Sequence, residues 1–267
     1  MKVALAQFAA GEDKPANLER LRALAGKGAA AGASLVLAPE ASMHGFEPSD
    51  RPLADVAEPL DGHFVTALGE IARELGLTIA AGMFETADGG RAFNTVVAVG
   101  PTGELAGSYR KQHLFDALGW TESARLAPGT AGDQLLLDVG DLRIGVLTCY
   151  DLRFPELARA LVDDGATALA IPSAWVAGPH KLDQWEALTT ARAVENVCYV
   201  LACGQPPPEY VGHSRVVDPF GDVLAALADE DGVAVADITA DRVTTCRQAM
   251  PSLSHRQWSV TPKAVSS

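Results

Sequence analysis

The sequence is poor in cysteine, and its cysteines are not spaced like metal ligands. Four occur among 267 residues, and no two of them form a Cys-x-x-Cys pair. A disulfide framework requires a denser set of cysteines and a zinc site requires closely spaced ligands, so we expect neither. No other cofactor is expected. Free thiols are typical of a reducing compartment, which favours a cytoplasmic protein.

Positive charge is also scarce. The chain has 21 lysines and arginines against 34 aspartates and glutamates, which gives a formal net charge of −13. Nucleic acids and anionic membranes both attract basic patches, so neither is expected as a partner. No apolar run reaches the length of a transmembrane helix, and no secretory leader is visible before the first predicted strand. A small molecule is the expected partner.

The composition is that of an ordinary globular protein, with 48% hydrophobic and 21% charged residues. Predicted strands and helices alternate, which indicates an α/β fold, and turns at 88–90 and 101–104 predict antiparallel hairpins within a mixed sheet. No linker or repeat divides the chain, so we expect one domain over 1–267, whose polar segment 252–267 is an arm that contacts a partner subunit. The predicted strands are 3–8, 34–38, 77–84, 94–99, 105–109, 142–149, 166–171, 198–202, 212–217, 223–227 and 233–238, and the predicted helices are 17–31, 62–76, 155–164 and 182–196.

One stretch, residues 142–157, joins a buried strand to the start of a helix. Its first half is a short apolar run, and Pro155 suits the first helical position, where no backbone N–H is needed. Cys149 therefore lies where the strand ends and the chain turns. A thiol there can project into a crevice beside backbone N–H groups that stabilise negative charge. We interpret Cys149 as a candidate nucleophile, although a lone cysteine is more often a small buried hydrophobic residue.

A thiol nucleophile needs a base, which is most often a histidine. The six histidines are scattered through turn-like segments and form no convincing Cys–His–Asn set. A carboxylate can serve instead where burial tunes its protonation. Glu40 follows the predicted strand 34–38, and Lys111, a candidate for oxyanion stabilisation, follows the predicted strand 105–109. Each would more often be a surface residue if considered alone, but their combination with Cys149 indicates catalysis.

Three segments resemble motifs of the nitrilase, or carbon–nitrogen hydrolase, superfamily. They are Leu37-Ala38-Pro39-Glu40, residues 109–115 (Tyr-Arg-Lys-Gln-His-Leu-Phe) and residues 149–156 (Cys-Tyr-Asp-Leu-Arg-Phe-Pro-Glu). They occur in the order of that family, with Glu first, then Lys, then Cys. The resemblance covers nearly the full chain, including residues 210–221.

This resemblance implies an αββα sandwich and dimers formed by stacking two sandwiches, so we expect a homodimer or a higher homo-oligomer. It also implies a Glu40–Lys111–Cys149 triad that works through a thioester intermediate. Glu122 would be the second acid of this family, which orients Lys111 and the substrate amide. The backbone N–H of Tyr150 would stabilise the oxyanion together with Lys111.

The residues that follow Cys149 favour an amidase over a nitrilase. They resemble the branch that includes ω-amidases and deaminated-glutathione amidases, whereas true nitrilases usually carry Trp-Glu after the cysteine. N-carbamoyl hydrolysis is a further alternative. Because few positive groups are identifiable at the mouth of the site, small aliphatic carboxamides are favoured over dicarboxylate monoamides as substrates.

Substrate-binding residues are expected around the mouth of the site. Segment 173–175 follows the predicted strand 166–171 and should face the same crevice as Cys149, although core packing explains Trp175 equally well. Arg153 is better explained as the structural partner of a carboxylate. The expected pocket residues are Phe46, Trp120, Ser173, Ala174 and Trp175.

Two other classes of function remain open. A non-catalytic member of the family could keep the fold as a binding or scaffolding module, but the presence of all three triad residues and of Glu122 argues against this. A redox-active protein would need a resolving thiol for Cys149, and nothing in the cysteine spacing indicates one.

Overall fold

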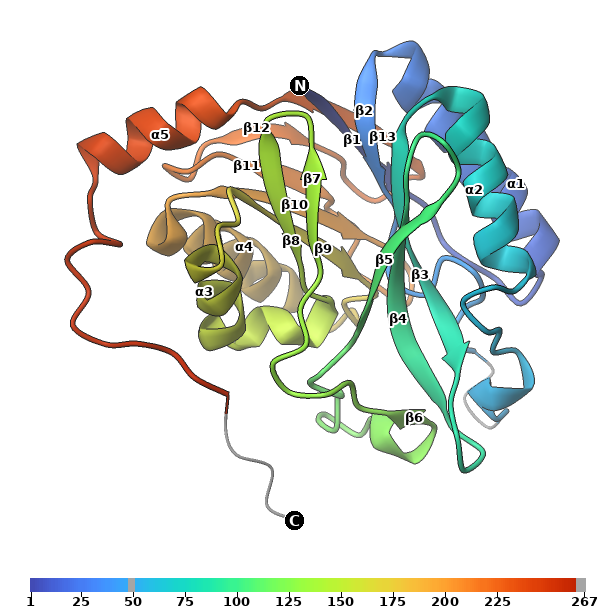
Figure 1. Ribbon diagram of the computed structural model, residues 1–267. Helices are drawn as coiled ribbons and strands as arrows, with labels where there is room; N and C mark the ends of the chain where they lie inside the picture. The colour runs from blue at the N-terminus through green and yellow to red at the C-terminus, as the bar shows by residue number, and fades with distance from the viewer. Residues whose placement is uncertain (48–50, 263–267) are drawn as a thin grey trace.

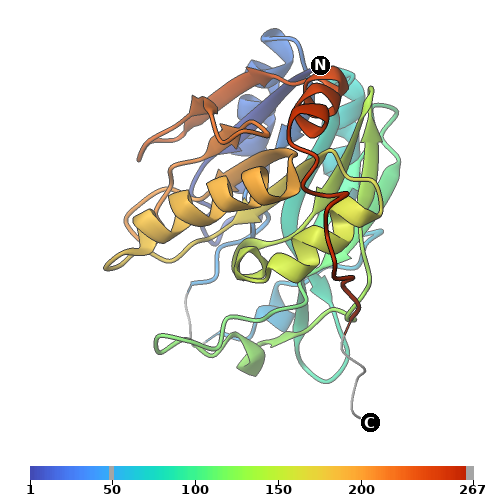
Figure 2. The same ribbon diagram turned by 90° about the vertical axis from the view of Figure 1, so that its left-hand side faces the viewer.

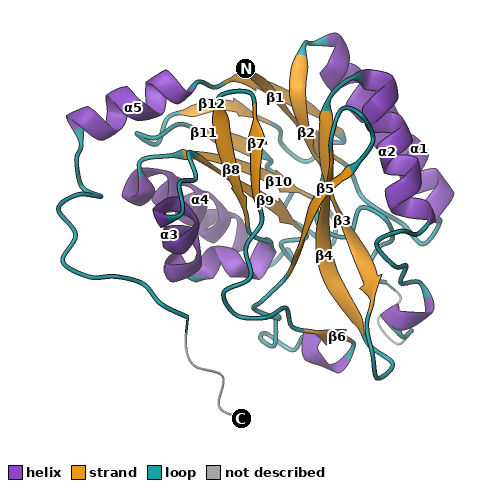
Figure 3. Ribbon diagram, in the orientation of Figure 1, coloured by secondary structure: helices purple, strands orange, loops and turns teal. Residues whose placement is uncertain are grey.

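The computed structural model describes residues 1–47 and 51–262 and contains two β-sheets packed face to face between layers of helices (Figure 1). Helices α1 and α2 cover one sheet, and α3 and α4 cover the other (Figure 3). The α/β class and the αββα sandwich expected from the sequence are therefore confirmed. In the described part of the chain, no helix is long and apolar enough to cross a membrane. The helices are α1 (Lys14–Ala30), α2 (His63–Leu75), α3 (Pro155–Asp163), α4 (Lys181–Asn196) and α5 (Ala240–Ala249).

The first sheet has the strand order β13-β1-β2-β3-β4-β5, with the short strand β6 paired to β4. β1, β2 and β3 are parallel, whereas β3 with β4 and β4 with β5 are antiparallel, which confirms the two predicted hairpins. The strands are β1 (Lys2–Gln7), β2 (Ala33–Leu37), β3 (Thr78–Thr86), β4 (Ala92–Val99), β5 (Leu105–Arg110), β6 (Leu126–Ala127) and β13 (Gly232–Asp237).

The second sheet has the strand order β12-β11-β10-β9-β8-β7. Its central strands β8, β9 and β10 are parallel, and the outer pairs are antiparallel. The turned view in Figure 2 shows α3 and α4 lying across this sheet. The strands are β7 (Leu136–Val139), β8 (Leu142–Val146), β9 (Ala168–Ser173), β10 (Tyr199–Gly204), β11 (Arg215–Val217) and β12 (Val223–Ala226).

The two faces of strand β1 pack into two different hydrophobic cores. Successive side chains of a strand point to opposite faces, and here Val3 and Leu5 join the core between the sheets. Ala4 and Ala6 join the other core, beneath α1 and α2. All four side chains are buried. Burial on both faces explains why the strand is a continuous apolar run instead of an alternating pattern.

Neither α5 nor β7 is predicted from the sequence. α5 buries only Val243 and Cys246, so its apolar periodicity is weak. After α5, the tail returns along α3, where Arg256 forms an ion pair with Asp163. The role of segment 252–267 as a subunit contact stays a prediction, and its last five residues, 263–267, lie outside the described residues.

Candidate active site

Cys149 lies in a strained turn between β8 and α3. It is the first residue of a short 3-10 turn, η3 (Cys149–Arg153), and its backbone φ of 47° falls in the left-handed region that a residue with a side chain rarely adopts. Such strain is concentrated at functional sites, where the surrounding structure maintains it. The turn therefore holds the thiol in a defined position at the end of the strand, as the sequence predicts.

Asp151 maintains this turn. Its buried carboxylate accepts hydrogen bonds from the Thr148 N–H at 3.0 Å and, through the same oxygen, from the Tyr109 hydroxyl at 2.7 Å. The His113 N–H donates to the other oxygen at 3.0 Å. Asp151 thus connects the turn of Cys149 to the end of β5. The spacing of Asp151 from Thr148 is that of a capping box, and this sequence signal could have identified Asp151.

Glu40 is buried three residues beyond the end of β2, and three donors fix its carboxylate. The Ala174 N–H donates to Oε2 at 2.6 Å, and the Asn94 side-chain amide donates to Oε1 at 2.6 Å. The third donor is the Lys111 ammonium, 2.9 Å from Oε1. Asn94 and the backbone of Ala174 are thus positioning groups that the sequence analysis does not predict.

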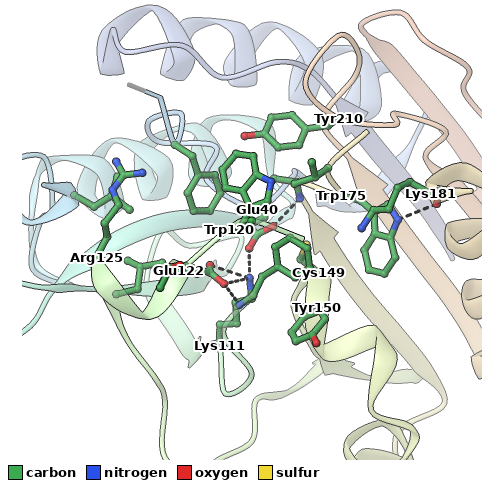
Figure 4. Close-up of a pocket in the computed structure, with 18 residues that line it drawn as sticks. Glu40, Lys111, Trp120, Glu122, Arg125, Cys149, Tyr150, Trp175, Lys181 and Tyr210 are labelled. Atoms are coloured by element: carbon green, nitrogen blue, oxygen red, sulfur yellow. Dashed lines mark hydrogen bonds and ion pairs between the residues drawn. The ribbon is translucent and has the colours of Figure 1, made fainter. Parts of the chain in front are cut away.

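Lys111 joins Glu40 to the second predicted acid, Glu122. Its Nζ lies 2.9 Å from each oxygen of Glu122 (Figure 4). The Phe115 N–H also donates to Glu122, at 2.5 Å. Burial alone would lower the pKa of Lys111, but the charges of Glu122 and Glu40 outweigh it and raise that pKa well above its usual range. Lys111 is therefore a permanent cation between two carboxylates.

The Cys149 thiol is protonated in the resting site. Burial, followed by the negative charge of Glu40, raises its pKa well above the usual range, although the charge of Lys111 opposes this shift. The thiolate is the nucleophilic form of cysteine. The raised pKa therefore disfavours the thiolate of Cys149, and Glu40 is the carboxylate that contributes most to this shift.

Most of the predicted residues line a cavity of about 270 Å³, just below the usual range for ligand sites, roughly 300–1,000 Å³. This size fits a small molecule. Glu40, Lys111, Glu122, Cys149 and Tyr150 all line it. The other lining residues are Phe46, Leu53, Phe115, Gly119, Trp120, Thr121, Arg125, Leu126, Ala174, Trp175, Val176, Lys181 and Tyr210.

Of the five expected pocket residues, Ser173 is the exception and does not line the cavity. The predicted strand ends at residue 171, whereas β9 continues through Ser173, which pairs with Gly204 of β10. Its side chain is fully buried, and its hydroxyl donates to the Ile171 carbonyl at 3.3 Å. Assigning Ser173 to the pocket was therefore wrong, because the residue belongs to the sheet.

The cavity contains cations that the sequence analysis missed. Lys181 and Arg125 both line it, so the expectation of few positive groups at the mouth was wrong. Lys181 lies one residue before the predicted helix, and nothing in its local sequence indicates a site. Arg125 donates to the backbone carbonyl of Arg51 at 2.8 Å. Tyr210, from the segment covered by the resemblance, is a further lining residue without a predicted role.

The remaining cysteines lie outside this site. Burial raises the pKa of Cys198 and of Cys203 to about 12, which leaves both thiols protonated. All four cysteines of the chain are free. Within residues 1–47 and 51–262, no group of three or more His, Cys, Asp or Glu side chains is arranged to hold a metal ion.

Comparisons with known proteins identify the family of the chain. The family model for carbon-nitrogen hydrolases matches residues 2–248. The deaminated glutathione amidase of Escherichia coli is 35% identical, covering 97% of this chain and 98% of its own length, and the omega-amidase of Bos taurus is 34% identical, covering 96% and 95%. The solved amidase of a Nesterenkonia species, described as a variant with acrylamide added at its active-site cysteine, is 28% identical, with a TM-score of 0.79 over 94% of this chain and 98% of that one. The chain therefore belongs to the carbon–nitrogen hydrolase family, within the nitrilase superfamily.

Proposed function

We propose that this protein is an amidase that hydrolyses small aliphatic carboxamides to a carboxylic acid and ammonia through a thioester on Cys149. The main observation behind this proposal is that Lys111 contacts two carboxylates, Glu40 and Glu122. All three line the same small cavity as Cys149, whose backbone is strained. The amidase names of two relatives and the active-site cysteine of the Nesterenkonia amidase support it.

Acylation begins with transfer of the thiol proton from Cys149 to Glu40 as sulfur attacks the amide carbon. The carbonyl oxygen then becomes an oxyanion. Lys111 and the backbone N–H of Tyr150 stabilise it, because a fixed cation and a fixed dipole act strongly where water is excluded. Glu40 returns the proton to the leaving nitrogen, and ammonia departs.

Deacylation uses the same groups, with water as the nucleophile and the Cys149 thiolate as the leaving group. Glu40 accepts a proton from water, whose oxygen attacks the thioester carbon, and Lys111 again stabilises the oxyanion. The thiolate then leaves and recovers its proton from Glu40, which releases the carboxylic acid. Glu122 does not exchange a proton in this scheme; it keeps Lys111 in place and accepts a hydrogen bond from the substrate amide.

Other substrate classes remain alternatives within the same chemistry. An ω-amide or a deaminated glutathione is favoured by the names of the two relatives and by the cations in the cavity. N-carbamoyl hydrolysis comes next, and a silent scaffold is the alternative outside catalysis. A homodimer and a cytoplasmic location also stay predictions, and analytical ultracentrifugation tests the first.

Ammonia release from a panel of compounds tests the proposal. The panel contains propionamide, glutaramate, an N-carbamoyl amino acid and a nitrile, each incubated with the protein and with Cys149→Ala. We expect release from the carboxamides that disappears in Cys149→Ala, and none from the nitrile. If the folded protein releases no ammonia from any compound, the amidase proposal is wrong.

A further inference from the structure

His113 lies two residues after Lys111 and contacts the turn of Cys149 from outside the cavity, which it does not line. Its ring Nδ1 is 2.7 Å from one oxygen of Asp151, and its backbone N–H donates to the same oxygen at 3.0 Å. A carboxylate can only accept hydrogen bonds, so Nδ1 carries the hydrogen of this contact. With the two donors on its other oxygen, the buried Asp151 carboxylate has four donors in all.

The imidazole of His113 is the donor to Asp151 that can also carry a positive charge. Among residues 1–47 and 51–262, no lysine or arginine forms an ion pair with Asp151, whereas His113 does so when it is protonated. Burial, followed by the charge of Asp151, raises the pKa of Tyr109 well above its usual range, so Tyr109 stays a neutral donor. A buried carboxylate is costly unless it is hydrogen-bonded or paired. The turn of Cys149 therefore depends on this imidazole.

The same imidazole contacts the turn at a second point. It stacks on the Phe154 ring, with ring centres 3.6 Å apart and planes inclined by 8°. Phe154 directly follows η3, and the Tyr150 ring packs edge-on against it at 5.3 Å. One side chain, that of His113, thus touches both the middle of η3, at Asp151, and its end. Tyr150, whose backbone N–H is assigned to the oxyanion, lies directly before Asp151 in this turn.

We propose that His113 is a positioning residue that acts through its Nδ1–H bond to Asp151. Lys111 lies two residues before His113, and Tyr150 lies one residue before Asp151. The bond therefore fixes the distance between the two groups that stabilise the oxyanion. This inference rests on the proposed amidase function and adds to it a residue that does not touch the substrate.

A matched pair of substitutions isolates this hydrogen bond. Asparagine and leucine have nearly the same shape, but only asparagine can place an N–H where Nδ1 lies. Because the oxyanion forms on the way to the transition state, its loss of support lowers kcat and leaves KM. We expect His113→Leu to lower kcat for propionamide about 10- to 100-fold, with KM within about threefold. His113→Asn should keep kcat within about fivefold of the unmodified protein.

Hydrogen exchange reports on the turn without any turnover. The Thr148 N–H donates to the Asp151 side chain, and the Asp151 N–H donates to the Thr148 carbonyl at 2.9 Å. When the turn loosens, these amides become accessible to solvent. By mass spectrometry, the peptide covering residues 148–154 should exchange about tenfold faster in His113→Leu than in His113→Asn, which should exchange like the unmodified protein.

His63→Leu is the control variant. It also removes an imidazole, but His63 is exposed at the start of α2 and does not line the cavity. Neither kcat nor the exchange of residues 148–154 should change in it. Turnover in every variant is divided by the amount of Cys149 that iodoacetamide alkylates, so that a loss of folded protein does not count as a loss of kcat.

The outcomes separate the inference from the function on which it rests. Equal kcat values in His113→Leu and His113→Asn, or equal exchange of residues 148–154, refute positioning by the Nδ1–H bond while the amidase function stands. If the unmodified protein hydrolyses no carboxamide, the amidase function is wrong, and the exchange rates still decide whether His113 holds the turn. If His113→Leu does not fold, His113→Phe, which keeps a ring against Phe154 but has no N–H, takes its place in both measurements.

Discussion

Replacing Glu40 by glutamine tests the role of the base with little change in shape. Glutamine has one acceptor oxygen where the carboxylate has two, and three donors point at this side chain. If its oxygen faces Lys111 and Asn94, its NH₂ group faces the Ala174 N–H, and one hydrogen bond is lost. The opposite orientation loses two bonds, one of them to a cation, so the first should dominate.

The expected cost in stability is therefore that of one buried donor left unsatisfied, about 1–3 kcal/mol. Lys111 adds no larger penalty, because it keeps both contacts with Glu122. For a chain of this size, this corresponds to a melting temperature lower by roughly 2–10 °C. Turnover should fall much further, about 10²- to 10⁴-fold, the usual contribution of a general base.

The same variant should make the thiol easier to ionise. Burial comes first and the charge of Glu40 second among the causes that raise the pKa of Cys149. In Glu40→Gln the second cause disappears while Lys111 stays, so the midpoint of thiol ionisation should move to lower pH. The variant is expected to lose amide hydrolysis and yet form the thiolate more readily than the unmodified protein.

The assay is the pH dependence of iodoacetamide alkylation, followed by intact mass, beside amide turnover in the same samples. Cys149→Ala shows which alkylation belongs to this thiol. A midpoint that stays or rises in Glu40→Gln would refute the electrostatic argument. Turnover within tenfold of the unmodified protein would refute the assignment of Glu40 as the base.

Three further substitutions test the support of the site. Gly82→Ala would place its Cβ 2.7 Å from the Glu40 Cα, so the backbone must shift. We expect kcat/KM to fall at least about tenfold, while circular dichroism shows that the variant is folded. Asp151→Asn replaces an acceptor oxygen by a donor at the turn of Cys149, and denaturant titration should show a loss of about 1–3 kcal/mol together with reduced turnover. Ser173→Ala removes a hydroxyl that makes a single long hydrogen bond, so steady-state kinetics should show KM unchanged, with a stability loss of about 1 kcal/mol or less.

Much of the site could be predicted because it lies at the ends of strands. Apolar runs with clear limits locate β2 and β8, and the turn at 101–104 locates β5. The carboxyl ends of parallel strands are where α/β folds place functional groups. Glu40, Lys111 and Cys149 each follow one of these strands by one to three residues. Local sequence therefore determined their positions, and the family motifs indicated that they belong together.

The rest depends on contacts that no local pattern encodes. Asn94 is buried within β4, and only the pairing of β4 with β3, which in turn pairs with β2, brings its amide to Glu40. Lys181 enters the cavity because the loop after β9 returns the first residue of α4 to the site. Ser173 was misplaced because the predicted strand was two residues too short, and a strand end is the least reliable part of such a prediction.

Hydrogen bonds of the site also join the two sheets, so the stability of the fold and the geometry of the site depend on the same contacts. The N–H of Ala174, just after β9 of the second sheet, binds Glu40 of the first. Tyr109 on β5 of the first sheet binds Asp151, which follows β8 of the second. Substitutions in this network should therefore lower stability and turnover together.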